Sequence, residues 1–172
     1  MININQKWNF YKTADAEPEL VDLPHTWNNM DGMDGDADYY RGECRYQKVI
    51  KKSELPMADM YYLEINGAAS SADVYVNGKK LAHHDGGYST WRVNLTEELT
   101  EDTKIEIDVD NAPSDKVYPQ VAHYTFYGGL YRDVNILAVA KSHFDMEYFG
   151  GKGLVITPEK HGEDAKIKVQ TF

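Results

Sequence analysis

The chain has 172 residues, 42% hydrophobic and 27% charged, which are the proportions of a soluble folded domain long enough for a substantial core. Its formal net charge of −10, with no offsetting block of lysine or arginine, argues against nucleic acid and anionic membranes as partners and favours a neutral ligand. The single cysteine, Cys44, excludes an internal disulfide and a multi-cysteine metal site.

The N-terminal segment gives no sign of export or membrane insertion. Residues 1–8 lack the cationic start and the apolar run of a signal peptide. No stretch approaches the ~20 apolar residues of a transmembrane helix. We therefore expect a cytoplasmic protein, or an exported one from which a leader has been removed.

Most of the chain has the period-two pattern of β-strands, with apolar and polar residues alternating over residues 61–66, 73–76, 105–110 and 166–170. The dipeptide Asn77-Gly78 predicts a two-residue hairpin, because a type I′ turn needs two positive φ angles. No long helical pattern occurs, and residues 96–100 are expected to form one short turn. These patterns predict an all-β, antiparallel β-sandwich of the jelly-roll kind. Five residues are expected to point inward: Val74, Val76, Ile105, Ile107 and Val109.

Two long irregular segments, residues 24–38 and 111–124, interrupt the strands. Loops of this length in a compact domain are either functional or disordered, and the aromatic residues in or beside both favour ordered, functional loops. After the second loop comes the pair Gly128-Gly129, which permits a positive φ or a close backbone approach. Residues 131–140 then read as one continuous strand.

The C-terminal part has a different character. We divide the chain into a sandwich domain, residues 1–143, and a linker with a hairpin, residues 144–172, which we interpret as the start of a truncated second domain. The hairpin carries Leu154, Ile156, Ile167 and Val169. Because burying such side chains is favourable, we expect the hairpin not to stay exposed. It would fold back, become disordered or, as we favour, pair with the same hairpin of another copy as a homo-oligomer.

Several motifs in order resemble those of the glycoside hydrolase family 2 enzymes, the β-galactosidase and β-glucuronidase group. They are Ile4-Asn-Gln-Lys-Trp-Asn-Phe10, Leu23-Pro-His-Thr-Trp-Asn28, Tyr39-Tyr-Arg-Gly42, Val74-Tyr-Val-Asn-Gly78, Gly86-Gly-Tyr88 and Tyr127-Gly-Gly-Leu-Tyr-Arg-Asp-Val134. The resemblance covers roughly residues 3–158. It implies a galactose-binding-domain-like jelly roll, the N-terminal sugar-binding domain of that family, and an immunoglobulin-like second domain after it.

The resemblance also implies that catalysis and substrate contact are divided between domains. The family's catalytic carboxylates lie in a separate barrel domain, so no catalytic residue is nominated here, and the chain alone is expected to be inactive. The domain would be scaffold and active-site rim of a retaining β-glycosidase, of β-galactosidase type, that acts on carbohydrates with a terminal β-linked sugar. The implied rim residues are Asn28, Asp31, His123 and Tyr124. His123 stands where an acid is common in the family, and a neutral imidazole can exchange one hydrogen bond with a hydroxyl.

Two other features have two interpretations each. Tyr88 and Trp91 either stack on a sugar or pack in the core. His83-His84-Asp85 resembles a metal clip, but neighbouring residues of a strand point to opposite faces, so we favour an ordinary loop and expect no metal. No cofactor is expected. Two alternatives to the enzyme-domain interpretation stay open: a free-standing carbohydrate-binding module and a structural oligomerisation sandwich.

Overall fold

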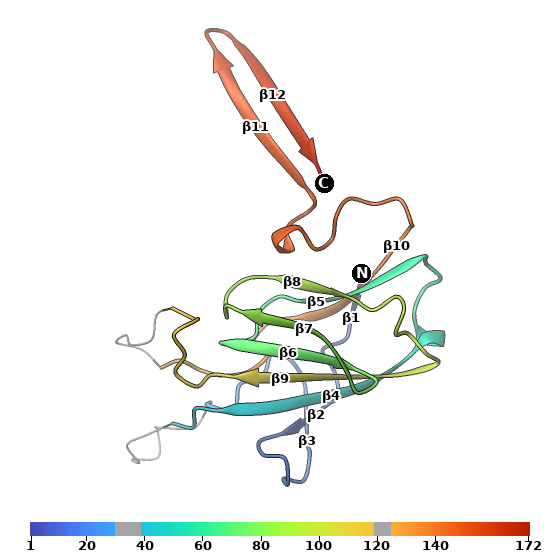
Figure 1. Ribbon diagram of the computed structural model, residues 1–172, viewed down its shortest axis with the longest axis vertical. Coiled ribbons are helices and arrows are strands. Elements are labelled where there is room, and N and C mark those ends of the chain that lie inside the picture. Colours follow the sequence, from blue (N-terminus) through green and yellow to red (C-terminus); the bar gives the residue numbers. More distant parts are fainter. Residues whose placement is uncertain (30–38, 119–124) are drawn as a thin grey trace.

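A computed structural model describes residues 1–29, 39–118 and 125–172. Two antiparallel sheets face one another in the described part, one in the order β1-β10-β5-β8 and the other in the order β3-β2-β4-β9-β6-β7 (Figure 1). The strands of the sandwich are β1 (Ile2–Asn3), β2 (Trp8–Tyr11), β3 (Glu19–Val21), β4 (Glu43–Lys51), β5 (Met60–Ile65), β6 (Ser71–Val76), β7 (Lys79–Asp85), β8 (Trp91–Asn94), β9 (Asp102–Asp110) and β10 (Val134–Val139). The predicted antiparallel β-sandwich is confirmed.

Helical structure in the described residues is limited to two 3₁₀ turns, η1 (Lys52–Glu54) and η2 (Tyr148–Gly150). Neither is long and apolar enough to cross a membrane, and the same holds for every helix in the described ranges. The expected turn after β8 is present, with the Glu98 backbone N–H donating to the Leu95 carbonyl at 3.0 Å.

The core lies between the two sheets and follows the period-two pattern of the sequence. All five residues predicted to point inward, in β6 and β9, are fully buried. Leu63 and Ile65 of β5 oppose them from the other sheet, also at 0% exposure. Between β6 and β7, Asn77 and Gly78 both have positive φ, 51° and 83°, and Val76 pairs with Lys79. The predicted hairpin is therefore confirmed.

The alternation over residues 61–66 predicts one apolar face and one solvent-facing side for β5, and the prediction of a solvent-facing side is wrong. Tyr62 and Glu64, on the side away from the core, are only 4% and 7% exposed. The segment after β10 covers them: Arg92 of β8 pairs with the Glu64 carboxylate at 2.8 Å and donates to the Met146 carbonyl at 2.8 Å. Glu64 is thus buried because a segment distant in the sequence lies over it and its charge is paired with Arg92.

The predicted strand over residues 131–140 is shorter, because β10 begins at Val134 and ends at Val139. Before it, the Tyr131 hydroxyl donates to the Gly87 carbonyl and Arg132 Nη1 donates to the Tyr88 carbonyl at 2.9 Å. These side-chain contacts direct residues 131–133 toward the Gly86–Tyr88 loop, so this part of the chain does not extend the sheet ladder.

The C-terminal hairpin consists of β11 (Leu154–His161) and β12 (Asp164–Thr171) and projects away from the sandwich (Figure 1). Nearly all residues of both strands are exposed. Its base is held by the Tyr148 ring, which stacks on Phe172 with centroids 3.9 Å apart. Of the three expected outcomes, the hairpin does not fold back on the sandwich, and its pairing between copies stays a prediction.

Candidate functional site

Two buried asparagine amides hold the loops together at one end of the sandwich. Asn28 and Asn111 are both 0% exposed. The Asn28 amide donates to the Tyr40 carbonyl at 2.8 Å, and its oxygen accepts the Gly128 N–H at 2.8 Å and the Asn111 amide at 3.2 Å. Asn111 in turn donates to the Phe126 carbonyl at 3.0 Å. Segments more than 80 residues apart in sequence are therefore fixed to one another without regular secondary structure.

The glycine pair is required by close packing. A Cβ atom at position 128 would lie 2.0 Å from Cζ2 of Trp27, and one at position 129 would lie 2.3 Å from the His25 carbonyl oxygen. Gly129 also has a φ of +132°. Only glycine fits both conditions, because it has no side chain and tolerates positive φ. The turn thus brings the aromatic residues that precede it against the first loop.

An aromatic cleft of about 340 Å³ opens beside this turn. Tyr88, Tyr118 and Tyr127 line it and are 57%, 88% and 42% exposed. We call it the aromatic cleft, and it is lined by Thr26, Ala69, Ser70, Gly87, Tyr88, Val117, Tyr118, Thr125, Phe126, Tyr127 and Tyr131. Large ring faces with hydroxyl groups at their edges suit a ligand that is apolar on one side and polar on the other.

The predicted rim residues have different placements. Asp31, His123 and Tyr124 lie outside the described residues, so their contacts stay predictions. Asn28 lies at the loop end, but its amide is buried and forms hydrogen bonds with Tyr40, Asn111 and Gly128. Its position therefore gives it a role in holding the loops that surround the aromatic cleft.

The two predicted stacking residues are separated by the fold. Tyr88 lines the aromatic cleft, whereas Trp91 is 7% exposed and its ring stacks on His84 with centroids 4.9 Å apart. Sequence reasoning did not nominate Tyr118 and Tyr127, although both line the cleft. The run of aromatic residues just before the glycine pair is the signal that points to Tyr127.

The histidine pair lies in strand β7, so the interpretation as a loop is wrong. His83 contacts the Asp73 and Asp85 carboxylates, whereas His84 points to the other face against Trp91. The hydrogen bond that His83 donates to Asp73 raises the pKa of His83, and burial lowers the pKa of His84. Within the ranges that the structure describes, no group of histidine, cysteine or acidic residues is arranged to hold a metal ion.

Cys44 is buried, and its burial raises the pKa of the thiol to about 12. Its sulfur lies 3.6 Å from the Lys12 carbonyl oxygen, to which the thiol donates. A thiol with so high a pKa is not a nucleophile near neutral pH, so Cys44 has a packing role.

Two face-to-face antiparallel sheets, with a ligand-sized cleft among the loops at one end, define a galactose-binding-domain-like β-sandwich. Residues 34–148 match the family described as glycosyl hydrolase 2 galactose-binding domain-like. The chain therefore belongs to glycoside hydrolase family 2 as its galactose-binding-like N-terminal domain, which confirms the resemblance found in the sequence motifs.

Relatives of the chain are glycosidases of greater length. A β-glucuronidase of Bacteroides fragilis is 29% identical over 177 residues, an alignment that covers 98% of this chain and 26% of that protein. A β-galactosidase of Thermoanaerobacter pseudethanolicus is 28% identical, with 76% of this chain and 18% of that protein covered. The crystal structure of an FMN-binding β-glucuronidase from Facaelibacterium prausnitzii L2-6 superimposes with a TM-score of 0.89 at 38% identity, covering 99% of this chain and 27% of that one. The chain thus spans about a quarter or less of these relatives.

Proposed function

We propose that this domain serves a family 2 β-glycosidase that hydrolyses a terminal β-linked sugar, and that its aromatic cleft forms part of the rim of the active site. The observation that carries the proposal is the cleft itself, which exposed tyrosines line at the loop end. The hydrogen bond between Gly128 and Asn28 holds the loops that form the cleft. Relatives named β-glucuronidase and β-galactosidase support this reaction class, with the catalytic carboxylates supplied by another domain.

The exposed tyrosines favour a contact with the substrate over a purely structural role. Tyr88 and Tyr127 present large surfaces to solvent although the same domain buries three tryptophans almost completely. Exposed aromatic surface that lines a cavity is typical of ligand contact, because both stacking and hydrogen bonding become available there.

The experiment uses the full-length enzyme that carries this domain, assayed with p-nitrophenyl β-glucuronide and p-nitrophenyl β-galactoside. Tyr88→Ala and Tyr127→Ala are expected to lower kcat/KM by about 5–30-fold on the preferred substrate, the loss of roughly 1–2 kcal/mol of stacking. Leu20→Ala is the control, because Leu20 is 66% exposed in β3 and does not line the cleft. Unchanged kinetics in both folded tyrosine variants would refute the proposal that the aromatic cleft forms part of the active-site rim.

The hairpin suggests the domain organisation of the same enzyme. Ile156 pairs with Val169 and Pro158 with Ile167, and these four side chains share one face of β11 and β12. The opposite face pairs Glu159 with Lys166 and Thr157 with Lys168. We propose that residues 144–172 form a linker and the first strands of an immunoglobulin-like second domain, whose core would cover the apolar face.

A further inference from the structure

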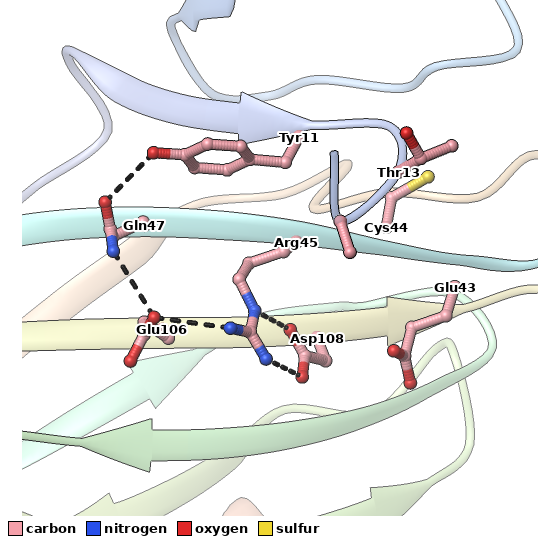
Figure 2. Close-up of a pocket in the computed structure, with 9 residues that line it drawn as sticks. Tyr11, Thr13, Glu43, Cys44, Arg45, Gln47, Glu106 and Asp108 are labelled. Atoms are coloured by element: carbon pink, nitrogen blue, oxygen red, sulfur yellow. Dashed lines mark hydrogen bonds and ion pairs between the residues drawn. The ribbon is translucent and has the colours of Figure 1, made fainter. Parts of the chain in front are cut away.

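A polar groove of about 350 Å³ lies on the outer face of the six-stranded sheet, away from the core (Figure 2). It shares no lining residue with the aromatic cleft. Side chains of β2, β4 and β9 form its floor, and residues 13 and 14 of the loop after β2 form one wall. We call it the outer-face groove, lined by Tyr11, Thr13, Ala14, Glu43, Cys44, Arg45, Gln47, Glu106 and Asp108.

The floor of the outer-face groove is a connected hydrogen-bond network. Arg45 binds Asp108 through two parallel bonds, from Nε to Oδ1 at 2.6 Å and from Nη2 to Oδ2 at 2.7 Å. Its Nη1 and the Gln47 amide both donate to Glu106 Oε1, at 3.4 and 3.3 Å. The Tyr11 hydroxyl donates to the Gln47 amide oxygen at 3.2 Å. The side chains are therefore held in place before any ligand arrives, which lowers the entropy cost of binding.

The network leaves both donors and acceptors unused. A guanidinium has five N–H groups and an amide two, so Arg45 and Gln47 each retain N–H groups beyond the bonds above. Glu43, at the end of the groove, has no hydrogen-bond or ion-pair partner for its carboxylate among the described residues, and no dashed line reaches it in Figure 2. The groove thus offers N–H donors beside a carboxylate acceptor.

The charges of the groove select the class of ligand. Three carboxylates, of Glu43, Glu106 and Asp108, outnumber the Arg45 guanidinium and the Lys104 ammonium that pairs with Glu106 at 3.0 Å, so an anion would be repelled. A cation would find Asp108 and Glu106 already bound to Arg45, and it would leave the free N–H groups unmatched. A neutral molecule with adjacent hydroxyl groups matches both the free N–H donors and the carboxylate acceptor, because each hydroxyl donates one hydrogen bond and accepts others.

Two further features favour a bound ligand over open solvent. The ring of Tyr11 lies at the edge of the groove and offers an apolar face to C–H groups. The pKa of Glu43 is raised, first by burial and then by the nearby Asp108 and Asp110 carboxylates. The Glu43 carboxylate is open to the groove and can accept a hydrogen bond from a ligand hydroxyl.

We propose that the outer-face groove is a second binding site, which holds adjacent hydroxyl groups of a neutral sugar residue on Glu43, Arg45 and Gln47. It is separate from the rim of the active site, so a saccharide can be held on this face while another part of it, or another molecule, occupies the aromatic cleft.

The experiment is a titration of the ¹⁵N-labelled chain, followed by two-dimensional NMR, with the neutral methyl β-glycosides of galactose, glucose and mannose. At least one is expected to shift the amide signals of residues 43–47 and 106–108 in a saturable way, with a dissociation constant of about 1–10 mM. Gln47→Ala, which removes one donor without leaving a buried charge unpaired, should weaken this binding about fivefold. Glu43→Gln should weaken it as well.

Matched variants distinguish this site from the rim. Gln170→Ala, on the exposed hairpin, and Tyr88→Ala, in the aromatic cleft, should leave the binding unchanged. Three results would overturn the proposal: no saturable shift with any of the three sugars, shifts that Gln47→Ala does not weaken, or stronger shifts at the same residues with glucuronate or spermidine. The activity of Tyr88→Ala in the full-length enzyme tests only the proposed active-site rim, because Tyr88 does not line the outer-face groove.

Discussion

Gly128 packs directly on the indole ring of Trp27, so closely that a Cβ atom at position 128 would lie 2.0 Å from the ring atom Cζ2. Trp27 is 6% exposed and has no room to move away without disturbing the core. This contact fixes the distance between the first loop and the turn that follows the second one. The aromatic cleft depends on that distance, because its lining residues come from both sides of the contact.

Gly128→Ala is therefore expected to destabilise the domain. Overpacking against a buried ring costs about 1–3 kcal/mol, which corresponds to a decrease in Tm of about 2–10 °C for a domain of this size. Thermal unfolding followed by circular dichroism measures the change. Gly151→Ala is the control, because a Cβ atom there meets only the Tyr148 carbonyl oxygen, at 3.3 Å. Equal Tm values for the two variants would contradict the packing argument.

Asn28→Ala should be more harmful than any surface substitution. It removes the acceptor of the buried Gly128 N–H, at about 1–3 kcal/mol for an unsatisfied group, and it removes the 2.8 Å hydrogen bond to the Tyr40 carbonyl, which also accepts the Asn111 amide at 3.5 Å. Urea unfolding should show a decrease in the free energy of unfolding of about 2–4 kcal/mol. Asn29→Ala is the neighbouring control, since Asn29 is exposed. A loss below about 0.5 kcal/mol would show that the amide does not hold the loops.

The adjacent histidines His83 and His84 should titrate on opposite sides of the ordinary value of 6.5. His83 is raised by its hydrogen bond to Asp73, so its contribution to stability is complete below pH 6.5 and is lost as the pH rises through the raised value. NMR titration of the imidazole signals measures both pKa values. Asp73→Asn should lower the pKa of His83 and leave that of His84 in place, and a joint shift of both would contradict the assignment.

The chain by itself is expected not to hydrolyse chromogenic β-galactosides or β-glucuronides. Retaining hydrolysis needs two carboxyl groups about 5–5.5 Å apart, one of which is free to donate a proton. The buried carboxylates of Glu106 and Asp108 both accept hydrogen bonds from Arg45, so neither is available as that acid. A release assay with the purified chain measures this. Turnover above the blank that disappears with one Asp or Glu substitution would overturn the expectation.

Copies of the chain are expected to associate through the apolar face of the hairpin. Ile167 is 64% exposed and Val169 is 58% exposed, on a two-stranded sheet with open edges. Light scattering should show a larger species for residues 1–172 than for residues 1–141, and Ile167→Lys should reduce it. Lys168→Ala, on the opposite face, should not. Equal sizes for the two chain lengths would show that the hairpin does not mediate association.

The sequence was sufficient for the strands and for the family. Alternating apolar residues identified the inward side of β6 and β9, because the side chains of a strand alternate strictly between its two faces. Asn77-Gly78 identified the hairpin turn, since its two positive φ angles are a local property of those residues. Motifs such as Leu23-Pro-His-Thr-Trp-Asn28 pointed to the family, and residues 34–148 match its model.

Only the tertiary structure decided which polar residues are buried and which side chains meet. Glu64 has the sequence position of a solvent-facing residue, yet Arg92 and the segment after β10 cover it. Asn28 reaches Gly128 across 100 positions of the chain, and Arg45 reaches Asp108 across 63. Such contacts depend on how strands distant in sequence pair and on which chain segments lie over their outer faces. A local sequence pattern describes one strand and its two faces. The Asn28–Asn111 contact, the aromatic cleft and the outer-face groove each combine residues from several segments, so they could be identified only in the assembled structure.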